Sequence, residues 1–305
     1  MFTKLKGSTC IVGLSGGPDS VYLLHQLVDQ KDILKLNLYV AHLDHEWRLN
    51  SVQDVLFCQS LCMQLQIPFI TKKASDFSTI KKIKGSQEAY GRSLRRAFFE
   101  TIKQELSADY IVLGHHADDQ IETFFIRLLR GASVQGLGGM YEYAGYYVRP
   151  LLHLTKKDII SYLKSNSIAY LIDETNNSDL YLRNRIRHTV MPALLKTDDR
   201  ASQKIIHTMQ QLQEVEHFLE QVTRQEYLRL VDNGVLSLVL FKRCELYMQK
   251  RIIQQWLIIH TVTFTQTALF FDEILRFLVS PRGGVHIMGT WSIHKKGSYA
   301  SIVLD

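Results

Sequence analysis

The chain has 305 residues, of which 46% are hydrophobic and 22% are charged. This composition is that of an ordinary soluble globular protein, and the length allows about two domains. Four cysteines are too few for a disulfide scaffold in a chain of this size. The formal net charge of +6 mildly favours an anionic partner.

The location of the protein is predicted from two missing sequence features. No apolar run approaches the ~20 residues of a membrane-spanning helix. The N-terminal residues MFTKLKG contain no apolar stretch typical of a secretory signal. We therefore expect a cytoplasmic protein with no membrane partner.

The first half of the chain alternates between strand and helix patterns. Strands are predicted at 9–14, 36–44, 69–73, 110–113 and 146–152. Helices are predicted at 19–30, 51–66, 86–106 and 117–130, and another after Thr155, which forms a capping box with Asp158. This order predicts an α/β fold, a doubly wound parallel five-stranded sheet that binds ligands at the carboxyl ends of its strands.

The pattern changes after about residue 176. Residues 201–228 and 241–278 have helical patterns, and short strand patterns follow at 285–288, 291–294 and 299–304. We predict a catalytic domain at 1–195 and a mainly helical domain for tRNA or substrate binding at 196–305, ending in short strands.

A glycine-rich loop, SGGPDS at residues 15–20, lies between the first predicted strand and helix. Gly16 and Gly17 allow close approach of an anion, and the start of a helix favours negative charge. The loop lacks the lysine of the G-x-x-x-x-G-K-[ST] phosphate loop. An ordinary strand-turn-helix connection is the alternative interpretation.

The second predicted strand ends with His42, Asp44 and His45. The histidines could ligate a metal, could simply be hydrogen-bonded at a strand end, or could belong to a loop that holds adenine or ribose. The third interpretation fits the predicted fold best.

Charged groups gather on two of the predicted helices. Glu88, Arg92 and Arg95 share one face of the third helix, where paired arginines could neutralise a polyphosphate or simply meet solvent. Asp119 and Glu122 are three residues apart at the start of the fourth helix, where their carboxylates could hold an ammonium group or Mg²⁺. Their alternative role is to interact with the helix dipole.

Basic residues cluster between positions 181 and 204, where there are six lysines and arginines and two acidic residues. Arg183 and Arg187 align at i, i+4 on a predicted helix. RNA phosphate or released pyrophosphate is the natural partner of such a pair.

These segments resemble the tRNA(Ile)-lysidine synthetase family of PP-loop ATP pyrophosphatases over about residues 9–192. The SGGPDS loop indicates the superfamily. Four further blocks resemble this family: HLDHEWRLNS from His42, EAYGRSLR from Glu88, HHADDQIET from His115 continuing to Gly131, and DETN from Asp173 followed by YLRNRIR to Arg187.

The resemblance implies a two-step ligation. ATP adenylates the 2-oxygen of the wobble cytidine in a tRNA(Ile) with the anticodon CAU, and the ε-amine of free L-lysine then displaces AMP to give lysidine. ATP and Mg²⁺ are the implied cofactors.

The resemblance also implies roles for individual residues. The implied catalytic residues are Asp19, Arg92, Asp119 and Glu122. The implied ATP-binding residues are Ser15, Gly16, Gly17, Pro18, Asp19, Ser20, His42, Gly114 and His115, with Asp19 near Mg²⁺. Asp119 and Glu122 would bind lysine, and Arg95, Arg183, Asn184 and Arg187 would bind tRNA or phosphate.

Two other functions are compatible with a PP-loop sequence. A tRNA thiolase is expected to carry Cys-x-x-Cys, whereas Cys58 and Cys62 are four apart on one predicted helix and suit a core. An RNA-binding protein that senses ATP without turnover is the second alternative. The sequence leaves the oligomeric state open, a homodimer included.

Overall fold

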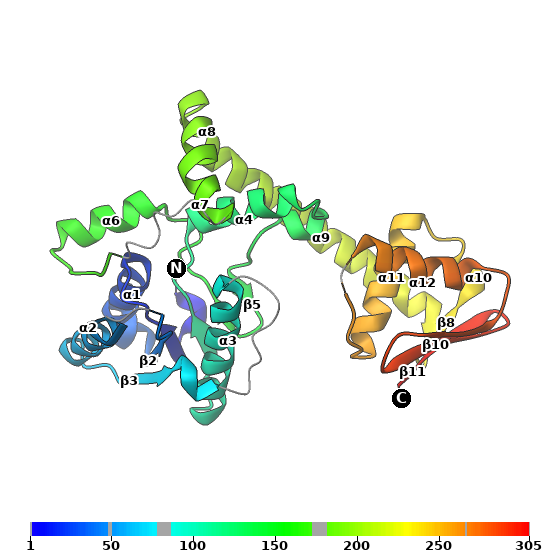
Figure 1. Cartoon of the computed structure of the whole chain (residues 1–305), viewed down its shortest axis with the longest axis horizontal. Helices are drawn as coiled ribbons and strands as arrows, with labels where there is room; N and C mark the ends of the chain where they lie inside the picture. The colour runs from blue at the N-terminus through cyan, green and yellow to red at the C-terminus, as the bar shows by residue number, and fades with distance from the viewer. Residues whose placement is uncertain (1, 48–50, 78–86, 173–181, 266, 305) are drawn as a thin grey trace. The chain divides into compact units, whose positions relative to one another are not determined.

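The computed structural model describes residues 2–47, 51–77, 87–172, 182–265 and 267–304 (Figure 1). The chain forms two compact units, Met1–Gln211 and Leu212–Asp305, and the division falls within the long helix α9 (Ala201–Leu230). The division into domains at residues 1–195 and 196–305 remains a prediction from the sequence.

The first unit is built on a six-stranded sheet with the strand order β3-β2-β1-β4-β6-β5. Its strands are β1 (Thr9–Gly13), β2 (Asn37–Asp44), β3 (Phe69–Lys73), β4 (Tyr110–Val112), β5 (Tyr143–Ala144) and β6 (Tyr147–Val148). Five of them are parallel, which confirms the predicted α/β fold, and β5 is an additional antiparallel edge strand.

The last parallel strand is shorter than the predicted 146–152. β6 ends at Val148, and Pro150, which has no N–H group to donate to a neighbouring strand, follows closely. The Arg149 N–H instead donates to the Glu142 carbonyl at 2.8 Å, which extends the β5–β6 hairpin. β5 lies outside every predicted strand, because its two residues are too few to form a strand pattern.

Helices cover both faces of this sheet (Figure 1). One core cluster joins the sheet to α1 (Pro18–Leu34), α2 (Ser51–Gln64) and α6 (Lys156–Ser165), and it includes the fully buried Leu23, Cys58 and Ile159. A second cluster joins the opposite face to α3 (Gln87–Glu105) through Leu94 and Phe98.

Shorter helical segments complete the first unit. Among the described residues they are two 3₁₀ turns (Thr3–Leu5 and Ala74–Phe77), α4 (Ala117–Leu129), α5 (Val134–Leu137), α7 (Leu182–Arg185), a π-helix (Ile186–Val190) and α8 (Met191–Thr197). α4 ends at Leu129, one residue before the predicted end at 130. Gly131 follows with a φ of +70°, a left-handed conformation that glycine adopts without strain.

The sheet order creates a switch point between β1 and β4. The chain moves from β1 outward to β2 and β3, and then returns to place β4 on the other side of β1. Loops that follow the two central strands therefore diverge at their carboxyl ends and leave a crevice for a ligand. The loop after β1 is SGGPDS, and the loop after β4 is GHH at residues 114–116.

The second unit combines helices with an antiparallel five-stranded sheet of order β7-β8-β11-β10-β9. Its strands are β7 (Val231–Asp232), β8 (Val235–Ser237), β9 (Gly284–Ile287), β10 (Trp291–Lys296) and β11 (Tyr299–Leu304). Trp256, Trp291 and Phe241 fill its core. A buried ion pair joins Arg251 to Glu216 at 2.9 Å.

The helical pattern predicted over 241–278 is divided among three helices. This stretch forms α10 (Leu238–Phe241), α11 (Leu246–Ile259) and α12 (Ala268–Val279). α11 ends before Thr261, a β-branched residue with a φ of +55°, and α12 begins after Thr267, whose side chain accepts a hydrogen bond from the Phe270 N–H.

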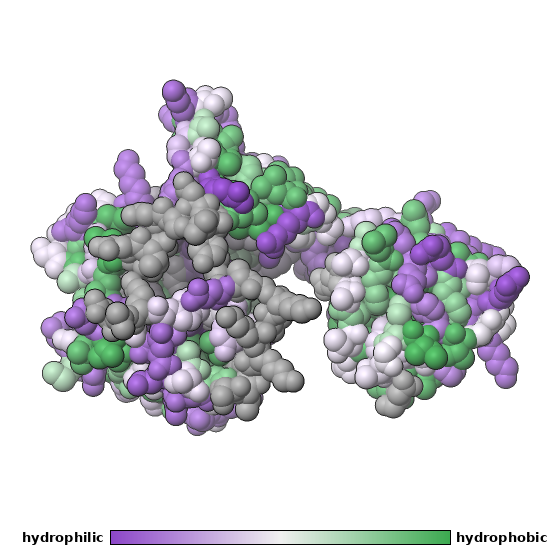
Figure 2. All heavy atoms as spheres, in the orientation of Figure 1, coloured by the Kyte–Doolittle hydropathy of each residue, from purple (hydrophilic) through white to green (hydrophobic). Residues whose placement is uncertain are grey.

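The surface of the second unit includes hydrophobic residues beside hydrophilic ones (Figure 2). Leu246, Ile258 and Leu269 are at least half exposed. Exposed apolar residues are common on folded proteins. None of the helices within the described residues is both long and apolar enough to cross a membrane.

Candidate active site

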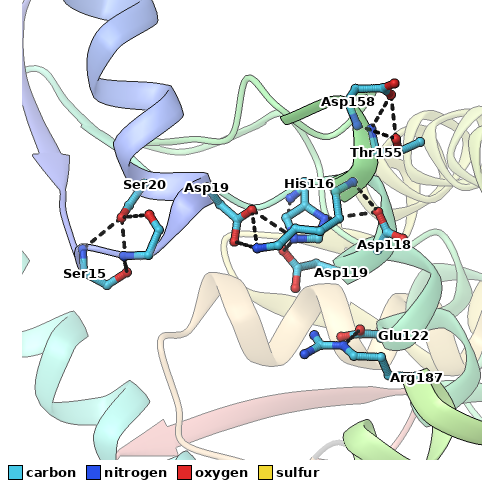
Figure 3. Close-up of polar contacts among 12 residues, drawn as sticks. Ser15, Asp19, Ser20, His116, Asp118, Asp119, Glu122, Thr155, Asp158 and Arg187 are labelled. Atoms are coloured by element: carbon cyan, nitrogen blue, oxygen red, sulfur yellow. Dashed lines mark hydrogen bonds and ion pairs between the residues drawn. The ribbon is translucent and has the colours of Figure 1, made fainter. Parts of the chain in front are cut away.

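The SGGPDS loop is closed by hydrogen bonds around a buried serine. The Ser20 hydroxyl accepts from the Ser15 N–H at 3.1 Å and donates to the Gly17 carbonyl at 3.0 Å (Figure 3). Gly16 has a φ of +81°, and a Cβ atom there would lie 2.7 Å from Leu171. The loop is therefore a fixed turn that requires glycine at position 16.

The loop leads directly into the positive end of α1. Gly17 is the N-cap residue, Pro18 occupies the first turn, and Asp19 follows as the acidic residue of that turn. Backbone N–H groups and the helix dipole at such a terminus attract anions.

The GHH loop after β4 packs tightly against the start of α1. A Cβ atom on Gly114 would lie 2.9 Å from the Asp19 carbonyl oxygen, closer than real Cβ contacts. Glycine at this position thus lets the loops after β1 and β4 touch at the switch point.

Acidic side chains surround His116 at this contact. The His116 Nε2 atom lies 3.6 Å from an Asp19 carboxylate oxygen and 3.5 Å from Asp119, while Nδ1 lies 3.4 Å from Asp118 (Figure 3). His116 is 95% buried, so these carboxylates act on it with little screening. Asp19 from α1 and Asp119 from α4 thereby converge on one imidazole.

The pKa of His116 is raised although the residue is buried. Burial alone would lower it, but the interaction with Asp118 and the charges of Asp119 and Asp19 outweigh that effect. The pKa of Asp119 is lowered. Burial alone would raise it, but the charges of His116, His115 and Arg183 lower it by more. The site thus favours a charged histidine beside charged carboxylates.

Burial lowers the pKa of three other histidines near the site, His42, His45 and His115. Burial lowers the pKa of His115 to about 4, although the Asp119 charge opposes the shift. Burial also lowers the pKa of His42, whose Nδ1 atom lies 2.9 Å from the Leu14 carbonyl just before the loop. His45 stacks on Trp47 with a centroid distance of 4.5 Å. The end of β2 therefore contacts the residue that leads into the SGGPDS loop through His42.

Glu122 lies one helical turn beyond Asp119 and is 98% buried. Its two carboxylate oxygens accept hydrogen bonds from the Nε atoms of Arg183 at 2.7 Å and Arg187 at 2.6 Å. Arg183 also approaches Asp119, with 3.6 Å between Nη2 and Oδ1. The implied lysine-binding carboxylates and the implied tRNA-binding arginines thus form one cluster.

The remaining residues implied by the resemblance are placed as follows. Arg92 and Arg95 are exposed on α3, and the charge of Arg95 contributes to lowering the pKa of both His45 and His115. Asn184 is buried in α7. The backbone of Glu88 belongs to α3. Five residues of the resembling blocks lie outside the described residues: Arg48, Asp173, Thr175, Asn176 and Tyr181.

Lys156 is a site residue that the sequence analysis missed. Its Nζ atom lies 2.7 and 2.6 Å from the two carboxylate oxygens of Asp19. The predicted capping box of Thr155 and Asp158 is confirmed, and it marks Lys156 as the first residue of α6. That local pattern fixes the helix start without indicating that it meets α1.

The carboxylates at this site are suited to one way of binding a magnesium ion. The described residues contain no group of three or more His, Cys, Asp and Glu residues arranged to hold a metal by themselves. Mg²⁺ in nucleotide sites, however, uses one or two carboxylates together with phosphates and water. The part-exposed carboxylate of Asp19 at the phosphate loop fits that second arrangement.

A family model described as the PP-loop domain matches residues 1–194. The chain belongs to the PP-loop family. The match covers the six-stranded sheet and the loops after β1 and β4, so the family assignment applies to the part of the chain that forms the site.

Curated relatives of this PP-loop chain carry a more specific name than the family model. A protein named tRNA(Ile)-lysidine synthase from Bacillus cereus is 31% identical over 301 residues, which cover 94% of this chain and 63% of the relative. One of the same name from Bacillus subtilis is 36% identical over 232 residues, covering 74% of this chain and 49% of the relative. These matches confirm the resemblance drawn from the sequence blocks. The chain spans between about half and two thirds of these relatives' length.

A solved structure supports the fold. The U34-tRNA thiolase NcsA from Methanococcus maripaludis, described with its 4Fe-4S cluster, matches with a TM-score of 0.59 and 17% sequence identity. The match covers 68% of this chain and 72% of the thiolase. At this identity the likeness concerns the PP-loop fold alone.

Proposed function

We propose that this PP-loop protein ligates lysine to the wobble cytidine of a CAU-anticodon tRNA(Ile), with ATP as the activating substrate. The observation that carries the proposal is the convergence of Asp19, Asp119 and the Glu122–arginine cluster beside the SGGPDS loop. The relatives named tRNA(Ile)-lysidine synthase support the same reaction.

The first step is adenylation of cytidine. The cytidine 2-oxygen bonds to the α-phosphorus of ATP, the bond to the bridging oxygen breaks, and pyrophosphate leaves with that electron pair. Residues 15–20 and the start of α1 bind the phosphates, and His42, Gly114 and His115 line the nucleotide site. Asp19 would hold Mg²⁺, which when bound neutralises phosphate charge.

The second step joins lysine to the activated ring. The ε-ammonium group first gives a proton to solvent, and the resulting amine forms a bond to the ring carbon. The carbon–oxygen bond breaks, its electron pair leaves on AMP, and the new nitrogen loses a proton to solvent. Asp119 and Glu122 bind lysine and position its amine, because carboxylates recognise ammonium groups. Glu122 is hydrogen-bonded to Arg183 and Arg187 in this structure. Lysine binding at Glu122 therefore involves exchange of these contacts.

The basic residues bind the polyanionic partners. We assign Arg92 to the catalytic phosphates, and Arg95, Arg183, Asn184 and Arg187 to tRNA or phosphate. Guanidinium groups suit this role because they bind two phosphate oxygens at once. We further propose that the reaction takes place in the cytoplasm, and a homodimer remains a prediction.

Release of pyrophosphate tests the proposal. We expect release from ATP only with CAU-anticodon tRNA(Ile), and AMP release with lysidine formation, detected as a nucleoside by mass spectrometry, only when lysine is added. Cleavage at the terminal phosphate, or modification that requires a sulfur donor in place of lysine, would contradict the proposed reaction.

The buried cysteines argue against a thiolase. Cys58 and Cys62 are fully buried in the core cluster of α1, α2 and the sheet. Burial raises the pKa of both thiols to about 12. Thiols in such surroundings act as small core residues and are poorly suited to ligating a cluster or carrying sulfur.

Gly114→Ala should weaken ATP binding by about tenfold, because the added methyl group displaces the start of α1. A Cβ atom at position 114 would lie only 2.9 Å from the Asp19 carbonyl oxygen. Calorimetric titration with ATP measures the effect.

Gly7→Ala is the control, because Gly7 has a φ of +75° and no neighbour within 4 Å of a Cβ atom. It should destabilise the fold and leave the ATP affinity unchanged. Equal ATP affinities for the two variants would contradict the predicted role.

A further inference from the structure

Lys156 contacts a phosphate loop that lacks a lysine of its own. Its ammonium group lies within 2.7 Å of both carboxylate oxygens of Asp19, 137 positions earlier in the chain. Asp19 directly follows the glycines that form the anion-binding turn. The structure therefore supplies, from α6, the positive charge that other phosphate loops carry at their own end.

The position of Lys156 is fixed by its backbone. The Lys156 N–H donates to the Asp118 carboxylate at 2.8 Å, and the Ala117 N–H donates to the Leu154 carbonyl at 2.8 Å. Thr155 and Asp158 cap the same end of α6. The start of α6 is thus tied to α4 through its main chain and to α1 through the Lys156 side chain.

The ion pair with Asp19 can be exchanged. The Lys156 side chain is 36% exposed and that of Asp19 is 27% exposed. Ion pairs that remain in contact with water are weak, and a triphosphate offers several negative charges in place of one. A lysine ammonium carries three donors on a flexible stem, so it can turn from a carboxylate to a nearby phosphate.

We propose that Lys156 is a phosphate-binding catalytic residue of this site, which pairs with Asp19 before ATP binds and contacts the β- and γ-phosphates when ATP is bound. This inference rests on the proposed use of ATP. When the bond between the α-phosphorus and the bridging oxygen breaks, its electron pair remains on pyrophosphate. The Lys156 ammonium group stabilises that growing charge. The same contact frees the Asp19 carboxylate for a magnesium ion.

The test compares Lys156→Gln with Lys157→Gln. Lys157 is the exposed next residue of α6, so the control removes the same charge one position away. The probes are ATP, inorganic pyrophosphate and AMP, each titrated calorimetrically without tRNA. For Lys156→Gln we expect at least tenfold weaker binding of ATP and pyrophosphate, with AMP affinity unchanged. Lys157→Gln should match the wild type for all three.

Two further measurements separate this role from a structural one. Lys156→Arg keeps the charge and should recover most of the ATP affinity. In turnover assays, Lys156→Gln should slow pyrophosphate release and leave the KM for lysine unchanged. An equal loss of ATP and AMP affinity, or an unchanged affinity for pyrophosphate, would overturn the inference.

The wild-type protein distinguishes failure of this inference from failure of the proposed function. If it binds ATP and releases pyrophosphate with a different acceptor, the proposed substrate is wrong and the comparison of the Lys156 variants still decides the lysine's role. If it does not bind ATP or pyrophosphate, both proposals are overturned.

Discussion

Asp19→Ala should lower the rate of pyrophosphate release at least about a thousandfold, the upper part of the range found when one stabilising group is removed from an active site. Asp19 lies at the start of α1, within 2.7 Å of Lys156 and 3.6 Å of His116. Its removal takes away the proposed magnesium ligand and the carboxylate that contacts Lys156 and His116. Rapid-quench measurement of pyrophosphate with saturating CAU-anticodon tRNA tests this.

Asp19→Ala should change stability far less than activity. The ion pair with Lys156 is partly exposed, and such pairs contribute about 0–1 kcal/mol. Asp29→Ala is the control, because Asp29 is an exposed carboxylate on the same helix and lies far along it from the loop. We expect similar melting temperatures for both variants and normal activity for Asp29→Ala. Activity of Asp19→Ala within tenfold of the wild type would refute the role assigned to this carboxylate.

The sheet and its ligand-binding edge could be predicted because their signals are local. An apolar run followed by Gly16 and Gly17 specifies a strand and a tight turn within ten residues. The capping box at Thr155 likewise depends on residues three positions apart. In these two places, where adjacent residues determine the conformation, the sequence pattern matches the observed element.

The hairpin between β7 and β8 was missed although its turn has a local signal. Asn233 and Gly234 have φ values of +48° and +80°, as a two-residue hairpin turn of the primed type requires. An Asn-Gly pair between Val231 and Val235 predicts such a hairpin. The strands have only two and three residues, which is too short for an alternating pattern to show.

The partners of the site residues could not be predicted because they depend on tertiary packing. Lys156 reaches Asp19 across 137 positions, and Arg187 reaches Glu122 across 65. The sequence analysis identified Glu122, Arg183 and Arg187 as candidates and assigned them to different substrates. Their direct pairing follows from the placement of α7 and the π-helix beside α4, which no local pattern encodes.

Glu122→Gln should lower the free energy of unfolding of the first unit by about 3 kcal/mol, the lower end of the cost of removing one partner from a buried ion pair. The lower end applies because Arg183 and Arg187 are 21% and 39% exposed and remain partly hydrated. Glutamine keeps the shape of the side chain and removes the charge that both guanidinium groups share. Thermal unfolding of this variant should begin roughly 10 °C earlier.

The same variant should impair the lysine step more than adenylation. Without the Glu122 charge, the proposed lysine site retains Asp119 as its carboxylate, and Arg183 keeps one contact with that residue at 3.6 Å. We expect the KM for lysine to rise by at least tenfold at a temperature where the variant is fully folded, with adenylation changed by less than threefold. Glu142→Gln removes an exposed carboxylate of the same unit and should match the wild type in both assays. An unchanged KM together with the full loss of stability would mean that Glu122 serves only to hold the arginines, and the lysine contact would then belong to Asp119.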